Sequence, residues 1–99
     1  MRITEIHGMN IELTDAIRTY IEEKIGSLEK MCAQYSPCDI AIEVGKTTNG
    51  QQKGNIWKAE MTMTIPGHSL RVERVTDDLY AAIDLAKDAL KQQLVEVKR

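Results

Sequence analysis

The sequence lacks an excess of positive charge and is poor in aromatic residues. Its 99 residues include 13 lysines and arginines, 15 aspartates and glutamates, one tryptophan, three tyrosines and no phenylalanine. A nucleic-acid-binding domain is usually basic, so the formal net charge of −2 counts against that class unless charge is segregated along the chain. It partly is: residues 1–45 hold four basic and eight acidic residues, and residues 46–99 hold nine and seven. This modest polarity could orient the molecule on a polyanion.

The sequence also lacks a membrane-length apolar run, a signal-peptide pattern and a cysteine-rich motif. We therefore expect a cytoplasmic protein without membrane association, folded as one domain over residues 1–99. A reducing compartment would keep the two cysteines, Cys32 and Cys38, as thiols. Because His7 and His68 are far from them in sequence and no CxxC motif is present, we expect no metal site.

Motifs for catalysis and cofactor binding are missing as well. Residues 45–47 (Gly-Lys-Thr) imitate the end of a phosphate-binding loop, but Ile40 stands where that motif needs a glycine. Neither histidine has a nucleophile and a carboxylate at an interpretable spacing. The acid pairs at 22–23 and 77–78 are typical of a solvated helix face and a helix start. We expect no enzyme, no cofactor and no small-molecule substrate.

The clearest periodic pattern lies at residues 77–97. Apolar residues recur there every three or four positions and form one stripe of an amphipathic helix: Leu79, Ile83, Ala86, Leu90, Leu94 and Val97. Asp77 is the expected N-cap. A second stripe, about 90° around the helix, contains Tyr80, Lys87, Lys91 and Lys98.

Two interpretations of this second stripe remain open. Its lysines either form a solvated face, paired with Asp84 and Asp88 at i,i+3 and i,i+4, or track the phosphates of a nucleic acid. Periodicity alone cannot separate these interpretations.

The remaining patterns predict one more helix and four strands. The helix begins after the N-cap Thr14, runs to about residues 31–33, and carries Arg18 and Lys24 at the two margins of its apolar stripe. The strands are expected at residues 1–7, 39–44, 57–65 and 70–73. The order β-α-β-β-β-α favours an α+β two-layer sandwich, a four-stranded sheet with two helices on one face.

The other face of this sheet is expected to be open to solvent. Its predicted residues are Glu43, Lys58, Glu60, Thr62, Thr64 and Arg71. No row of aromatics lies among them, which argues against base stacking on the sheet.

Several segments resemble the ribosome hibernation-promoting and ribosome-associated inhibitor family, once called sigma-54 modulation proteins. Residues 78–84 (Asp-Leu-Tyr-Ala-Ala-Ile-Asp) are similar to the signature that opens the last helix of that family. The hairpin at 65–67 (Ile-Pro-Gly), the strand at 70–73 (Leu-Arg-Val-Glu) and the first helix at 12–30 also match, in the same order.

The resemblance implies a fold similar to a double-stranded-RNA-binding domain and a ribosome-associated translation inhibitor. Such a protein binds the small ribosomal subunit in the channel used by messenger and transfer RNA, and blocks translation under stress or starvation. By position, the contacts to ribosomal RNA would be Arg18, Lys24, Lys30, Lys87, Lys91, Lys98 and Arg99. Further candidate contacts are Lys46, Lys53, Arg71, Arg74 and Tyr80. Because the chain ends at Arg99, we expect the short form, monomeric when free and without the dimerisation domain of long forms.

The chain departs from the family pattern at several positions that are often basic. These positions hold Ser27, Ala89, Gln92, Val95 and Glu96. Fewer phosphate contacts reduce affinity and its salt dependence. The alternative is therefore a protein-interaction module that acts through the acidic first helix or by adding a strand to the sheet edge.

Overall fold

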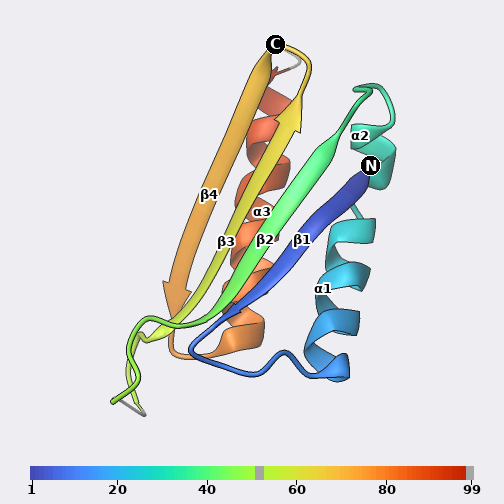
Figure 1. The fold of residues 1–99 in the computed structure, drawn as a ribbon. Helices are drawn as coiled ribbons and strands as arrows, with labels where there is room; N and C mark the ends of the chain where they lie inside the picture. Colours follow the sequence, from blue (N-terminus) through green and yellow to red (C-terminus); the bar gives the residue numbers. More distant parts are fainter. Residues whose placement is uncertain (51–52, 98–99) are drawn as a thin grey trace.

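The protein is an α+β sandwich with a four-stranded mixed sheet, as the sequence predicts. The computed structural model describes residues 1–50 and 53–97. Its elements, in chain order, are β1 (Arg2–Met9), α1 (Asp15–Gly26), α2 (Glu29–Cys32), β2 (Asp39–Lys46), β3 (Trp57–Ile65), β4 (His68–Thr76) and α3 (Leu79–Val97). The strands lie in the order β1-β2-β3-β4; β1 is parallel to β2, and the other two pairs are antiparallel (Figure 1).

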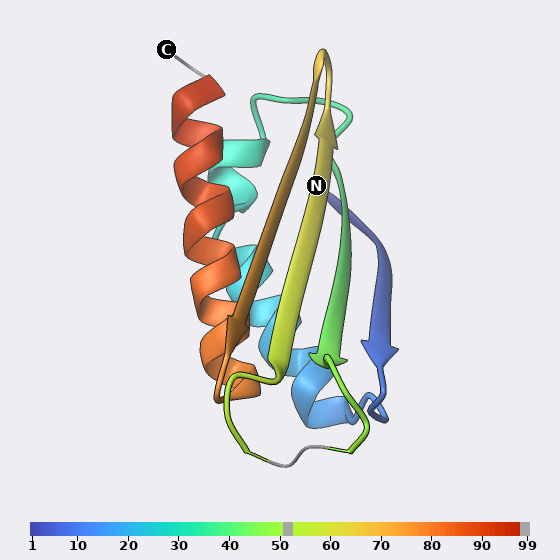
Figure 2. The same cartoon turned by 90° about the vertical axis from the view of Figure 1, so that its left-hand side faces the viewer.

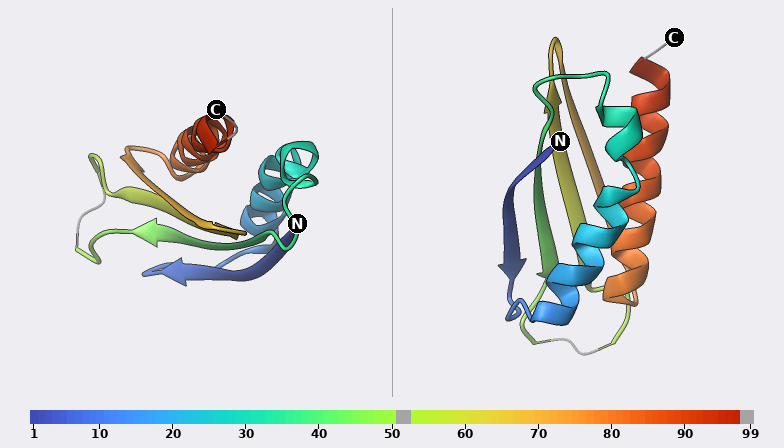
Figure 3. Two further views of the ribbon diagram at one scale, coloured as in Figure 1. Left: turned by 90° about the horizontal axis from the view of Figure 1, so that it is seen from above. Right: turned by 90° about the vertical axis from the view of Figure 1, so that its right-hand side faces the viewer.

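All helices cover the same face of the sheet and leave the other face open (Figures 2 and 3). The α3 helix packs on β3 and β4, and α1 lies beside it toward β1 (Figure 3). The core is formed by the predicted apolar stripe of α3 and by alternate residues of the central strands, which are buried: Ile40, Ile42, Val44, Ala59, Met61 and Met63. Within the described segments, no helix combines the length and the apolar character that a transmembrane span needs.

The predicted first helix is divided, and this corrects the expectation of one helix to about residue 33. After Gly26 the backbone N–H groups of Ser27 and Leu28 bond to carbonyls three residues back, and the Ser27 hydroxyl donates to the Lys24 carbonyl at 2.6 Å. These bonds tighten the last turn, and the chain turns helical again at Glu29. A Cβ at position 26 would meet nothing within 4 Å, so packing does not explain this glycine. Leu28 and Cys32 still reach the core.

The first two strands extend further than the sequence patterns predicted. A register shift between Ile3 and Glu5 explains the imperfect alternation of β1, because it lets Ile3 and Ile6 both pack against the core. Gly45 continues β2 beyond the predicted end, with φ of 155°. A Cβ there would lie 1.9 Å from the Met9 carbonyl oxygen, so only glycine allows β1 to approach this closely.

The turn into α3 corrects the predicted N-cap. The side chain of Asp78, rather than that of Asp77, accepts a hydrogen bond from the Ala81 N–H at 2.9 Å. β4 continues to Thr76. The Thr76 hydroxyl donates a hydrogen bond to the Asp78 carbonyl at 2.6 Å and accepts one from the Asp78 N–H at 3.1 Å. This turn places the cap one residue later than the sequence pattern indicated.

Candidate nucleic-acid interface

Five of the basic residues predicted to contact RNA lie on helices that the structure describes, and we name the surface that they form the helix face. Arg18 and Lys24 lie on α1, Lys30 on α2, and Lys87 and Lys91 on α3. The two remaining predicted residues, Lys98 and Arg99, lie outside the described residues. Because all three helices cover one face of the sheet, these five cations share one layer of the molecule (Figure 3).

The structure does not gather all five cations into one row. Arg18 and Lys24 are six residues apart in α1 and therefore point about 120° apart around its axis. Lys24 faces α3, where its ammonium lies 3.4 Å from the Asp84 carboxylate. Arg18 consequently lies on the opposite flank of α1, away from the groove between the helices. Within the described part of the chain, Arg18 has no carboxylate within 4.0 Å.

Tyr20, Lys24, Tyr80 and Asp84 meet between α1 and α3, and we name them the interhelical cluster. The Tyr20 hydroxyl donates a hydrogen bond to Asp84 Oδ1 at 2.7 Å. The rings of Tyr20 and Tyr80 pack edge to face, with centroids 4.7 Å apart. The Lys24 ammonium lies 5.3 Å from the Tyr20 ring centroid. Tyr80 remains 38% exposed, so it packs against its neighbour and also presents one side to solvent.

The cluster shifts the protonation equilibria of its members. Three causes raise the pKa of Tyr20: the hydrogen bond that its protonated phenol donates to Asp84, burial of the phenol, and the negative charge of Asp84. The same carboxylate raises the pKa of Lys24 by accepting a hydrogen bond from its ammonium and by its charge. At neutral pH the tyrosine is therefore neutral and the lysine is charged.

Lys87 forms an ion pair with its neighbour in sequence rather than with a residue one turn away. Its ammonium lies 2.7 Å from Asp88, and hydrogen bonding to this lysine lowers the pKa of Asp88. The predicted i,i+3 and i,i+4 pairs among Asp84, Lys87, Asp88 and Lys91 are absent from the described ion pairs. Asp84 instead lies beside Lys24 of α1, so its partner comes from another helix.

The further candidate contacts are dispersed. Lys46 lies at the end of β2, with its ammonium 5.3 Å from the Trp57 ring centroid, and Lys53 is exposed in the connection between β2 and β3. Arg71 lies on the open face of the sheet, where it pairs with Glu60 and Glu73. Arg74 is exposed on β4 and donates to the Glu73 carbonyl at 2.7 Å. None of these four basic side chains belongs to the interhelical cluster.

The open face of the sheet carries carboxylates in adjacent strands. Glu43, Glu60 and Glu73 are directly opposite one another across β2, β3 and β4, and His7 is opposite Glu43 on β1. Lys58 offsets their repulsion, because its ammonium lies within 3.9 Å of all three carboxylates.

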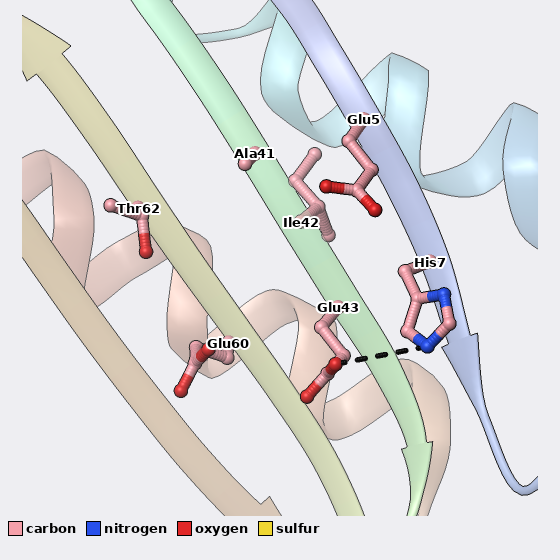
Figure 4. A pocket seen from close by; sticks show the side chains of 7 residues that line it. All are labelled: Glu5, His7, Ala41, Ile42, Glu43, Glu60 and Thr62. Atoms are coloured by element: carbon pink, nitrogen blue, oxygen red, sulfur yellow. Dashed lines mark ion pairs between the residues drawn. The ribbon is translucent and has the colours of Figure 1, made fainter.

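A hollow of about 360 Å³ lies beside this row, over Ala41 and Ile42 (Figure 4). Its remaining lining side chains are Glu5, His7, Glu43, Glu60 and Thr62. Across residues 1–50 and 53–97, no three His, Cys, Asp or Glu side chains are arranged to hold a metal ion.

Both cysteines are buried thiols. Cys32 is the buried residue of α2, and its sulfur lies 4.0 Å from that of Met63. Burial, followed by a hydrogen bond with Cys38, raises the pKa of Cys32 to about 12. A thiol with this pKa is almost never a thiolate at neutral pH, so it acts as part of the core.

The sequence analysis missed Tyr20 and missed the interhelical role of Asp84. A signal was present, because Tyr20 precedes Lys24 by four residues and Tyr80 precedes Asp84 by four. Each pair forms a short polar stripe beside an apolar one. Only the packing of α1 beside α3 shows that the two stripes face each other.

Comparison with known proteins identifies relatives over nearly the whole chain. The model of the family described as sigma 54 modulation protein / S30EA ribosomal protein matches residues 4–99. Among solved structures, the crystal structure of the Thermus thermophilus Protein Y N-terminal domain is 34% identical, with a TM-score of 0.79, covering 98% of this chain and 99% of that one. A ribosomal subunit interface protein from Coxiella burnetii shares the fold at 21% identity and a TM-score of 0.80, covering 99% of this chain and 98% of that one.

Two curated relatives are both named ribosome hibernation promotion factor. The protein from Staphylococcus aureus (strain COL) is 40% identical over 94 residues, which are 95% of this chain and 47% of the relative. The protein from Deinococcus radiodurans is 33% identical over 98 residues, which are 99% of this chain and 50% of the relative. The chain thus spans about half the length of these relatives. On the match of its sequence from residue 4 to residue 99, the chain belongs to the sigma 54 modulation protein / S30EA ribosomal protein family.

Proposed function

We propose that this chain is a cytoplasmic translation inhibitor that binds the small ribosomal subunit. The helix face contacts ribosomal RNA in the channel used by messenger and transfer RNA, and the folded body excludes both from that channel. No catalytic step is involved, because occupancy alone blocks translation. The observation that carries the proposal is the family match over residues 4–99, joined to a helix layer that presents lysines and an arginine.

The charges of the helix face fit a role in binding phosphates. Lys30, Lys91 and Arg18 are exposed, and within the described segments they have no carboxylate within 4.0 Å. Such cations are free to replace counterions on RNA, which gives binding a steep dependence on salt. Lys24 and Lys87 are less available, because each already lies beside an aspartate.

The test is co-sedimentation of the protein with purified ribosomal subunits at two salt concentrations. We expect the protein to pellet with the small subunit at low salt and to be released at high salt. The double substitution Lys87→Ala with Lys91→Ala should weaken binding and reduce the slope of log K against log salt by about one to two, because Lys91 is unpaired in the described chain and Lys87 is already paired with Asp88. Pelleting with the large subunit only, or with neither subunit at low salt, would contradict the proposal.

A charge-matched control separates RNA contact from net charge. Arg2→Gln with Arg71→Gln also removes two positive charges, but from the sheet. Arg2 lies on β1, and Arg71 lies on the open face. We expect this control to bind nearly as the unmodified protein does. An equal loss in both double variants would mean that overall charge, rather than the helix face, governs binding.

A second candidate is a protein-interaction module. Its support is the outer side of α1 and α2, where Glu22 and Glu29 are exposed and have no basic partner within 4.0 Å in the described chain. β1 is also an edge strand, to which an extended peptide could add (Figure 1). This module would keep its partner after Lys87→Ala with Lys91→Ala and lose it when Glu22 and Glu29 are reversed in charge.

A further inference from the structure

A carboxylate lies among the basic residues of the helix face. A surface that binds RNA would be expected to have none there. Asp84 lies between the two helices, bonded to Tyr20 at 2.7 Å and 3.4 Å from the Lys24 ammonium. Its side chain is 42% exposed, so it would face any RNA that approaches the groove. A carboxylate at this place repels phosphates and reduces the attraction of the lysine beside it.

The four residues of the interhelical cluster constrain one another. Tyr20 and Lys24 lie one turn apart on α1, as do Tyr80 and Asp84 on α3. The aromatic residues meet edge to face, and the charged residues meet as an ion pair. Lys24 is held by two partners at once, the carboxylate and the Tyr20 ring 5.3 Å from its ammonium. A long, flexible side chain is thereby restricted to one place.

We infer that Asp84 is a positioning residue. It makes the helix face prefer RNA that holds its phosphates in one fixed arrangement over other RNA. This inference rests on the proposed function. Asp84 acts through Lys24, because it partly neutralises that ammonium and fixes its position between the helices. Disordered or unrelated RNA gains little from a lysine that already has a partner. When folded RNA holds a phosphate at that position, Lys24 is already ordered, so binding costs less conformational entropy.

Asp88 provides a matched comparison on the same helix. It is also an aspartate beside a lysine, with Lys87 at 2.7 Å, and it lies one turn after Asp84. Its side chain is 62% exposed, and its ion pair is formed within α3. Replacing either aspartate with asparagine removes one negative charge near the helix face, but only Asp84→Asn also releases a side chain of α1.

The experiment measures two affinities for each variant at one low salt concentration. One ligand is an RNA duplex of unrelated sequence, and the other is the purified small ribosomal subunit. For Asp88→Asn we expect both affinities to rise together, by about two- to fivefold, because only charge has changed. For Asp84→Asn we expect the same rise for the duplex and no rise, or a fall, for the subunit. The ratio of the two affinities therefore falls only in Asp84→Asn.

A charge-neutral double variant keeps the inference testable if the single substitution perturbs folding. Lys24→Gln with Asp84→Asn removes one charge of each sign, so duplex affinity should stay within about twofold of the starting value. Affinity for the subunit should fall by about fivefold, because one fixed phosphate contact is lost. An unchanged subunit affinity in this variant would overturn the inference.

A spectroscopic measurement shows that the cluster has opened. The Asp84 carboxylate raises the pKa of Tyr20, so Asp84→Asn should lower that pKa toward its ordinary value, whereas Asp88→Asn should leave it unchanged. Ultraviolet titration of the phenol follows this, and Tyr20→Phe assigns the signal. If Asp84→Asn opens the cluster and shifts both affinities as Asp88→Asn does, the inference fails and the proposed function stands. If the unmodified protein does not bind the small subunit, the proposed function itself fails.

Discussion

The two faces of the sheet are built from alternate residues of the same strands, yet they hold the protein together in different ways. On the covered face, β2 and β3 contribute apolar side chains that are almost fully buried under α1 and α3. On the open face, the same strands carry glutamates opposite one another, bridged by Lys58 and Arg71. Burial of apolar surface stabilises the fold strongly, whereas ion pairs near the surface contribute little each.

The comparison separates stability from recognition. The covered face fixes where the helices lie and, through them, where the lysines of the helix face project. The open face has its basic residues already paired with carboxylates, so it offers few free cations to RNA. The helix layer, by contrast, holds three exposed cations without a carboxylate within 4.0 Å in the described chain: Arg18, Lys30 and Lys91.

The largest difference between the faces should appear on substitution of adjacent residues in β3. Met61 is fully buried, and Thr62 next to it lies on the open face. We expect Met61→Ala to lower the free energy of unfolding by about 2–5 kcal/mol, because it leaves a cavity in the core. Thr62→Ala should cost below about 1 kcal/mol. Urea denaturation measures both values, and equal losses would remove the distinction between the faces.

A smaller effect is expected where the chain passes from the sheet to the helix layer. Asp78 caps α3 through the Ala81 N–H, so Asp78→Ala should cost about 1 kcal/mol. Asp77→Ala is the control and should change stability by less than about 0.5 kcal/mol, because its side chain makes no cap bond. Thermal unfolding followed by circular dichroism compares them. A larger loss of stability for Asp77→Ala than for Asp78→Ala would show that Asp77, the residue that the sequence indicated, is the cap.

The smallest effect is expected from the charges of the open face. Lys58 is 17% exposed and lies near three carboxylates, so Lys58→Gln leaves these carboxylates to repel one another. We expect a loss of about 0.5 kcal/mol at low salt that shrinks in 1 M sodium chloride, where screening is strong. The exposed Lys53 provides the control, because Lys53→Gln should be nearly neutral. If the loss of stability for Lys58→Gln does not change with salt, Lys58 stabilises the fold through packing of its aliphatic chain and not through its ion pairs.

Local patterns predicted most of the fold. The alternation of Ile40, Ile42 and Val44 and the helical spacing of the apolar stripe in α3 each require one covered face, and a two-layer sandwich satisfies both. The patterns failed where contacts distant in sequence decide the ends of elements. The approach of Met9 to Gly45 extends β2, and the turn at Thr76 moves the start of α3.

The candidate site was less predictable than the fold. Helical spacing placed Arg18 and Lys24 at the two margins of one apolar stripe, and the structure agrees. It could not indicate which margin faces the other helix, nor that Asp84 would pair with Lys24 and leave Lys87 to Asp88. The roles of Arg18, Lys30 and Lys91 in binding RNA stay predictions.

By itself, the sequence determined the apolar faces of α3 and the central strands, the order of the elements apart from the break after Gly26, and the family, because hydrophobic periodicity and short motifs are properties of the chain read locally. Tertiary structure alone decided how the charges are partnered. Two residues 64 positions apart, Tyr20 and Asp84, meet only after both helices have packed on the sheet. The energy of a charge depends on what lies within a few ångströms of it, and that distance is set by packing and not by sequence separation.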